Sequence, residues 1–174
     1  TAEEADESGS YNWTHFNGTE HANRYAPLDQ INADNVSELE VAWSFDTSPF
    51  GPSPESYSVT TPLMVDGTLY ATAGATRNVI ALDAVSGQIK WMWRPQEGER
   101  FDTAPRKGAG RGVAFWRDGD ESRILTITPG FHLVALDAKT GVPDPDFGEN
   151  GVVDLFEGLR NAYADGYEDV DIGS

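Results

Sequence analysis

The stretch VIALDAVSGQIKW, residues 79–91, recurs later in the chain as LVALDAKTGVPDPDF, residues 133–147. Each copy places an aspartate at the end of a short apolar run and a glycine four positions after that aspartate. An aspartate side chain accepts hydrogen bonds from the backbone of a following turn, and glycine readily adopts a left-handed conformation. The repeated phrase therefore predicts the same tight turn between two antiparallel strands at two places.

Alternating apolar residues bounded by turn residues surround both copies of the phrase. The strands predicted for the first unit are 58–65, 68–72, 79–82 and 88–93, and those for the second unit are 112–116, 123–128 and 132–137. The turns predicted between them contain Asp66-Gly67, Asp118-Gly119 and Pro129-Gly130. Four-stranded units that recur every ~40–55 residues are typical of β-propeller blades. We predict an all-β chain that forms a portion of a propeller with four-stranded antiparallel blades.

The two copies differ at the position ten residues after their shared alanine, which is Trp91 in the first copy and Pro145 in the second. We expect Trp91 to lay its indole on the neighbouring blade and to donate its N–H to a carbonyl, and we expect Trp43 to hold blades together as well. An ordinary core position within its own blade is the alternative for Trp91. Proline cannot donate to a strand ladder, so we predict that the fourth strand of the second unit is irregular or displaced, and that residues 143–159 form a loop insertion.

The chain divides into four predicted segments. Within the second segment we expect a short strand at 39–45 and a turn of helix at 35–39 that Asp34 caps. Two blades do not close a ring, so we expect the remaining blades on a continuation of the chain or on another chain. The segments are an acidic disordered or irregular lead-in (1–23), a connecting segment with one strand (24–57), the first blade and a loop (58–105), and the second blade, an insertion and the start of a third blade (106–174).

Composition excludes several classes of function. The 29 acidic residues outnumber the 12 basic residues and give a net charge of −17, which argues against binding to nucleic acid or anionic membranes. The chain has no cysteine, which excludes disulfides, thiolate catalysis and Cys-ligated metals. The sequence has no apolar run of the ~18 residues that would indicate a membrane-spanning helix.

Four stretches carry a resemblance to a known family. They are RYAPLDQINADNVSELEVAWSF (24–45), TPLMVDGTLYATAGATRNVIALDAVSGQIKWMWRP (61–95), RGVAFW (111–116) and FGENGVVDLFEGL (147–159). In this order they resemble the N-terminal part of the pyrroloquinoline quinone (PQQ)-dependent alcohol and glucose dehydrogenases. The resemblance implies an eight-bladed propeller that holds PQQ near its axis with a divalent ion, usually Ca²⁺, and that oxidises an alcohol, polyol or sugar. It also implies cytochrome c or a quinone as electron acceptor and a periplasmic or secreted location.

The resemblance assigns some residues toward PQQ. Arg111 matches the arginine that pairs with the cofactor, and a guanidinium suits the three carboxylates of PQQ. Lys107 stands roughly where the glucose branch has a histidine that faces the cofactor. The resemblance implies that either Lys107 or the glycine backbone around Gly108 and Gly110, which allows close approach to a flat ring, forms that face. The family's metal ligands and catalytic aspartate lie beyond Ser174, so we assign no catalytic or metal-binding residue in this chain.

The sequence departs from the family where a glutamate often stands three residues before the proline of TPL. Val59 occupies that position, and Thr60 or Thr61 would have to supply a polar contact to the cofactor. An alternative reading is a non-catalytic propeller scaffold that binds protein partners in the cell envelope, because such scaffolds share the A-x-D-x-x-[ST]-G-x-x-x-W phrase. The segments at 24–45 and 147–159 favour the enzyme.

Overall fold

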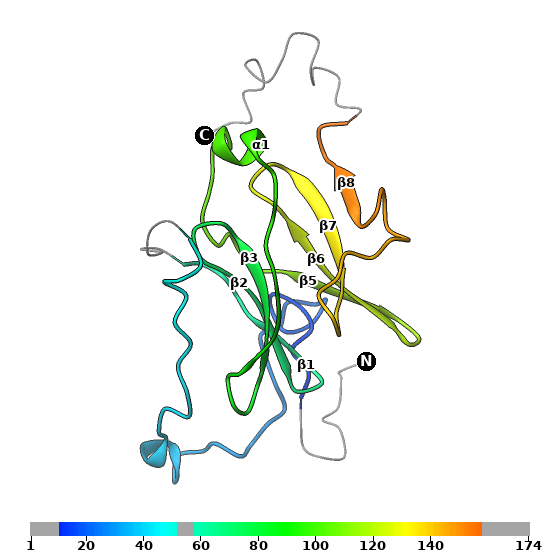
Figure 1. Ribbon diagram of the computed structural model, residues 1–174. Helices are drawn as coiled ribbons and strands as arrows, with labels where there is room; N and C mark the ends of the chain where they lie inside the picture. Colours follow the sequence, from blue (N-terminus) through cyan, green and yellow to red (C-terminus); the bar gives the residue numbers. More distant parts are fainter. Residues whose placement is uncertain (1–10, 52–57, 158–174) are drawn as a thin grey trace.

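The computed structural model describes residues 11–51 and 58–157, and it consists mainly of two antiparallel four-stranded sheets (Figure 1). In each sheet the strands follow one another in chain order, which is the arrangement of a propeller blade. The first sheet comprises β1 (Leu63–Val65), β2 (Thr68–Ala73), β3 (Asn78–Asp83) and β4 (Ile89–Trp93). The second comprises β5 (Ala114–Asp118), β6 (Glu121–Ile127), β7 (His132–Asp137) and β8 (Val152–Asp154). The predicted all-β class with four-stranded blades is confirmed.

The predicted turns hold with small shifts. Asp66 and Gly67 both have positive φ angles, 48° and 69°, as a two-residue type I′ hairpin requires. The hairpin between β5 and β6 turns at Gly119 and Asp120, one position later than Asp118-Gly119, because Asp118 still pairs with Glu121. The repeated aspartates behave as expected, since Asp83 accepts hydrogen bonds from the backbone and hydroxyl of Ser86.

Two predictions in the N-terminal part were wrong. Residues 39–45 form no strand with any described residue, because Trp43 and Phe45 pack on a sheet face while no neighbouring strand lies beside their backbone. The predicted turn of helix is the short 3-10 helix η1 (Val36–Glu38), which begins after Asn35, so Asp34 does not cap it. The helix η1 stands away from the two sheets (Figure 1).

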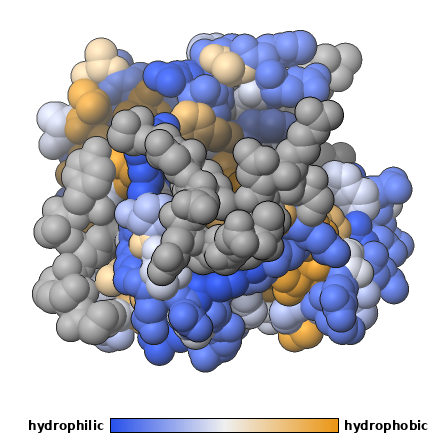
Figure 2. All heavy atoms as spheres, turned by 90° about the horizontal axis from the view of Figure 1, so that it is seen from above, coloured by the Kyte–Doolittle hydropathy of each residue, from blue (hydrophilic) through white to orange (hydrophobic). Residues whose placement is uncertain are grey.

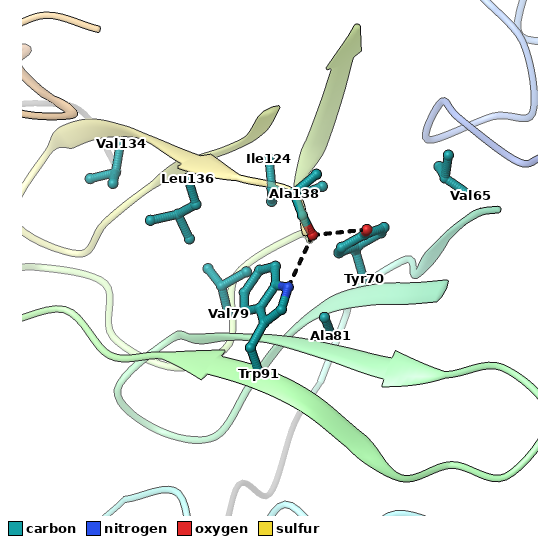
Figure 3. Packing of buried hydrophobic residues seen from close by; sticks show 9 residues of the cluster. All are labelled: Val65, Tyr70, Val79, Ala81, Trp91, Ile124, Val134, Leu136 and Ala138. Carbon is teal, nitrogen blue, oxygen red and sulfur yellow. Dashed lines mark hydrogen bonds between the residues drawn. The ribbon is translucent and has the colours of Figure 1, made fainter. Parts of the chain in front are cut away.

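The main core lies between the two sheets, where apolar side chains of both face one another (Figure 3). Its buried members are Val65, Tyr70, Val79, Ala81, Trp91, Ile124, Val134, Leu136 and Ala138. Burying each large apolar side chain of this kind contributes about 1.5–3 kcal/mol. The sheets are therefore joined face to face, as neighbouring blades are.

Trp91 crosses from the first sheet to the second. Its indole Nε1 donates to the carbonyl oxygen of Ala138 at 3.0 Å, and the Tyr70 hydroxyl donates to the same oxygen at 3.0 Å (Figure 3). The ring lies directly on Gly141, where an added Cβ would come under 3.0 Å from it. This arrangement of Trp91, Ala138 and Gly141, called the Trp91 contact below, confirms that the tryptophan packs on the neighbouring blade.

Trp43 makes the same arrangement one unit earlier. Its Nε1 donates to the carbonyl oxygen of Ala84 at 3.2 Å, and its ring lies on Gly87 within the same short distance of an added Cβ. Ala84 and Gly87 occupy the positions in the first copy of the phrase that Ala138 and Gly141 occupy in the second. We call this arrangement of Trp43, Ala84 and Gly87 the Trp43 contact. It helps to cover the face of the first sheet that points away from the second sheet.

The fourth strand of the second sheet is displaced, as Pro145 predicts. β8 begins at Val152, inside the predicted insertion, and pairs with β7 only over residues 152–154. A salt bridge from Arg123 to Asp144 holds the intervening loop against β6. The insertion thus supplies the missing strand.

Parts of the predicted organisation lie outside the described residues. These are the acidic stretch at 1–10, residues 52–57 of the connecting segment, and residues 158–174 with the expected start of a third blade. On the face seen in Figure 2, hydrophilic residues cover much of the described surface and apolar residues form separate patches. In the described ranges, no helix has both the length and the apolar character needed to cross a membrane.

Candidate functional site

The connection from β4 to β5 carries most of the predicted site residues. It begins with the short helix α1 (Glu99–Asp102) and continues as a glycine-rich loop through residues 105–112. The Gly108 amide donates to the carbonyl of Ala75 at 3.0 Å, and the Thr61 amide donates to the carbonyl of Arg111 at 3.4 Å. The loop is thus fixed to the first blade at Gly108 and at Arg111.

An open cavity of about 1200 Å³ lies against this loop. Among the residues that the structure describes, its lining includes the predicted residues Lys107, Gly110 and Arg111 together with Arg77 and Arg106, but no aspartate or glutamate. Apolar side chains form much of the remaining wall, namely Val59, Val113, and Leu125, Ile127 and Leu133 of the second sheet. In a chain with a net charge of −17, a cavity whose described lining has four cationic side chains and no carboxylate is suited to an anionic ligand.

The cations of the cavity differ in their availability. The Lys107 ammonium donates to the carbonyl of Asp102 at 2.8 Å and lies over the Phe101 ring, so it is folded back onto α1. The guanidinium groups of Arg106 and Arg111 make no hydrogen bond or salt bridge with the described residues, and both side chains are exposed. Arg111 and Arg106 are therefore the cations that can pair with a ligand without first losing a partner.

Arg77 was not predicted from the sequence, yet it organises this loop. Its Nε donates to Gly108 O at 3.1 Å, its Nη1 to Ile127 O at 3.1 Å and its Nη2 to Arg106 O at 3.4 Å. Burial lowers the pKa of Arg77, while the charge of Glu97 acts in the opposite direction. No local pattern reveals this role, because the three acceptors are backbone carbonyls 29 to 50 positions away in the sequence.

The predicted threonines are occupied within the protein. The Thr60 hydroxyl lies 3.0 Å from that of Thr72, and Thr61 pairs through its backbone with Gly112. Of residues 59–61, the cavity lining includes Val59 but neither threonine. A contact from Thr60 or Thr61 to a ligand thus stays a prediction.

A buried polar network secures the same connection to the second sheet. The Glu97 side chain is only 4% exposed, and its carboxylate accepts from the Thr128 hydroxyl, the Gly130 amide and His132 Nδ1. His132 Nε2 lies 3.0 Å from Nη1 of Arg100. Because arginine only donates, this geometry places the His132 proton on Nδ1. A buried carboxylate is thereby satisfied, as burial requires.

Arg100 continues the network to the displaced strand. Its guanidinium makes a bidentate salt bridge with Asp154 on β8 and lies over the Phe156 ring, 5.0 Å from its centroid. The hydrogen bond from Arg100 is the main reason that the pKa of Asp154 lies below its ordinary value. The network was not predicted, since residues that bond each other in it are separated by up to 54 positions.

Comparison with known proteins identifies the family. Residues 13–171 match the family described as "PQQ: Glucose/ethanol/alcohol dehydrogenase, beta-propeller domain". The chain belongs to this PQQ dehydrogenase propeller family. The match covers most of the chain and confirms the resemblance seen in the sequence.

Individual relatives agree with the family. The chain is 32% identical to the glycerol dehydrogenase large subunit of Gluconobacter thailandicus, over 84% of this chain and 21% of that protein. It is 35% identical to the dehydrogenase subunit of the quinone alcohol dehydrogenase of Gluconobacter oxydans (strain 621H), over 74% of this chain and 16% of that protein. The chain thus spans about a fifth of the length of the curated relatives that it matches.

A solved structure shows the same fold. The quinohemoprotein alcohol dehydrogenase from Comamonas testosteroni superposes with a TM-score of 0.67 and 30% identity, covering 87% of this chain and 20% of that one. The two four-stranded sheets of this chain thus correspond to part of the larger propeller of that protein.

The described residues suit PQQ. The cofactor is a flat tricarboxylate, and the cavity offers two guanidinium groups that have no hydrogen-bond partner among the described residues, a glycine-rich loop and an apolar wall. Ligand pockets commonly span about 300–1,000 Å³, so the volume suffices. No group of three or more ligating side chains within the described ranges could hold a metal ion.

Proposed function

We propose that the full protein is a PQQ-dependent dehydrogenase that oxidises an alcohol, a polyol or a sugar, and that this chain supplies part of its cofactor site. PQQ accepts a hydride when bound, and a divalent ion, usually Ca²⁺, acts beside it as a Lewis acid. The observation that carries the proposal is the cationic cavity, which is lined by no carboxylate of the described residues, in a strongly acidic chain. The family membership identifies which anion suits it.

The chain's own residues would bind and orient the cofactor. Arg111 and Arg106 would pair with its carboxylates, and charge-assisted hydrogen bonds of this kind contribute about 1.5–3 kcal/mol each. The loop backbone around Gly110 would approach the ring, with Lys107 at its edge. The apolar wall would exclude water and strengthen these ion pairs.

The wider setting follows from the same proposal. We expect a small alcohol or sugar as substrate, cytochrome c or a quinone as electron acceptor, and a periplasmic or secreted location. The remaining blades, with the catalytic aspartate and the metal ligands, would come from a continuation or a further chain. The strong net negative charge argues against a nucleic-acid partner.

Native mass spectrometry of the full-length polypeptide, purified without cofactor and then supplied with PQQ and Ca²⁺, tests the proposal. We expect one PQQ per ring and dye-linked oxidation of at least one alcohol or sugar. Arg111→Gln should weaken PQQ binding by about tenfold or more, because one charge-assisted pair is lost. Arg117→Gln is the matched control, since Arg117 pairs with Asp66 away from the cavity.

A folded ring that takes up no PQQ would contradict the enzyme and would favour a scaffold that binds protein partners. Equal weakening by Arg111→Gln and Arg117→Gln would show that the effect is general and would remove Arg111 from the site.

A further inference from the structure

We propose that Arg77 is a positioning residue, which holds the loop of residues 106–112 in the shape that presents Arg111 and the glycine backbone to the ligand. The inference rests on the proposed function, because the ligand is taken to be PQQ. Arg77 itself would act through the loop. Its guanidinium is already bonded to protein carbonyls, whereas that of Arg111 has no such bond to a residue that the structure describes.

The contacts of Arg77 join the loop to both sheets. Arg77 lies in the turn between β2 and β3 of the first sheet, and Ile127, one of its acceptors, ends β6 of the second sheet. Its other two acceptors, Gly108 and Arg106, belong to the loop. One side chain thus fixes the loop against two blades at once, next to the cavity wall.

The backbone around Arg77 is adapted to this position. Arg77 has a φ of 55°, a left-handed conformation that is uncommon for a residue with a side chain. Its amide donates to Gly74 O at 3.1 Å, which closes the turn. The turn brings the Arg77 guanidinium within hydrogen-bonding distance of the loop carbonyls.

Gly110 is the counterpart of Arg77 on the loop. A Cβ added to Gly110 would lie 2.8 Å from Arg77 Nε and 3.1 Å from its Cζ. The φ of Gly110 is +73°, so a side chain there would also be strained. The loop therefore closes on Arg77 only because residue 110 is a glycine.

Lysine would not replace arginine here. The three acceptors lie in different directions, and the planar guanidinium fork can reach them together while an ammonium is a single point charge. Arg77→Lys consequently keeps the charge of the cavity and removes the positioning. This separates positioning from a simple electrostatic effect.

The test compares full-length native protein with Arg77→Lys, Gly110→Ala and the control Arg94→Lys, an arginine that bonds Asn78 outside the cavity lining. Amide hydrogen exchange of residues 106–112 measures the loop, and titration with PQQ measures affinity. We expect both test variants to speed exchange in the loop but not in β3 or β7, and to raise the PQQ Kd about tenfold or more, because the ligand contacts are misplaced. The variant that combines Arg77→Lys with Gly110→Ala should raise the PQQ Kd by less than the product of the two separate fold-changes. Both substitutions break the same contact between Arg77 and the loop.

The inference is overturned if Arg77→Lys leaves loop exchange unchanged, or if it speeds exchange while the PQQ Kd stays within about twofold of native. If native protein binds no PQQ, the proposed function has failed, and the ligand role of Arg77 falls with it. Faster loop exchange in Arg77→Lys would in that case show that the contact orders the loop alone. The two failures are thus distinguishable.

Discussion

The Trp43 contact and the Trp91 contact use the same three groups in two different settings. Each tryptophan donates to the carbonyl of an alanine in the repeated phrase and lies on the glycine three positions later. Trp91 belongs to β4, whose backbone is bonded to β3, whereas the segment that carries Trp43 pairs with no described strand. The contact can therefore form whether or not the tryptophan belongs to a paired strand. We expect it to stabilise the fold more where the backbone of the tryptophan is hydrogen-bonded in a sheet.

The largest effect is expected from removing the rings. Trp91→Ala should lower the free energy of unfolding by about 3–5 kcal/mol, because it empties a buried site and leaves the Ala138 carbonyl with one donor fewer. Trp43→Ala should cost about 1–2 kcal/mol, because that ring is only partly buried. Denaturant unfolding followed by circular dichroism measures both, with the exposed Trp116→Ala as control. Equal costs for Trp43 and Trp91 would show that the sheet behind Trp91 adds nothing.

An intermediate effect is expected from the glycines beneath the rings. Gly141→Ala and Gly87→Ala should each be destabilising by about 1–3 kcal/mol, because the methyl group enters the space of the indole. Gly141→Ala should be the costlier, since Trp91 is less able to move. Gly67→Ala is the matched control, because its φ of +69° is nearly the same but nothing lies within 4 Å of its added Cβ. If Gly67→Ala lowers the free energy of unfolding as much as Gly141→Ala does, strain of the positive φ angle alone accounts for the loss of stability, and the contact with the indole ring adds nothing.

The smallest effect concerns the acid dependence of the turn beneath Trp43. Hydrogen bonds from the Ser86 amide and hydroxyl lower the pKa of Asp83. A carboxyl whose folded pKa is lowered contributes stability above its unfolded pKa, about 3.9, and loses it as the pH falls through the folded value. Asp83→Asn should therefore flatten the loss of stability below about pH 4, as measured by unfolding midpoints across the acid range. The same flattening in Asp120→Asn, a carboxylate on the β5–β6 turn, would show that Asp83 has no special part in it.

Local signals explain which parts of the fold were predictable. The repeated phrase, the Asp66-Gly67 turn and the proline at position 145 all act through neighbouring backbone, so the sequence revealed the strands and the displaced β8. The strand predicted at 39–45 was wrong because alternation reports which face is buried and does not report whether a partner strand lies beside it.

The candidate site was predictable only where a family pattern marks it. Arg111, Lys107 and Gly110 were selected by resemblance, and the structure places all three on one cavity. Arg77 and the Glu97–His132–Arg100–Asp154 network were missed, because each depends on contacts between segments distant in sequence. Such contacts leave no periodic pattern in one sequence.

The most direct test of the account is an experimental structure of the full-length protein with PQQ bound. We expect PQQ in the cavity beside residues 105–112, with a cofactor carboxylate within hydrogen-bonding distance of the Arg111 guanidinium and with Arg77 still bonded to the loop carbonyls. PQQ bound elsewhere in the ring, with Arg111 in solvent, would contradict the central claim that this loop and its cations form part of the cofactor site.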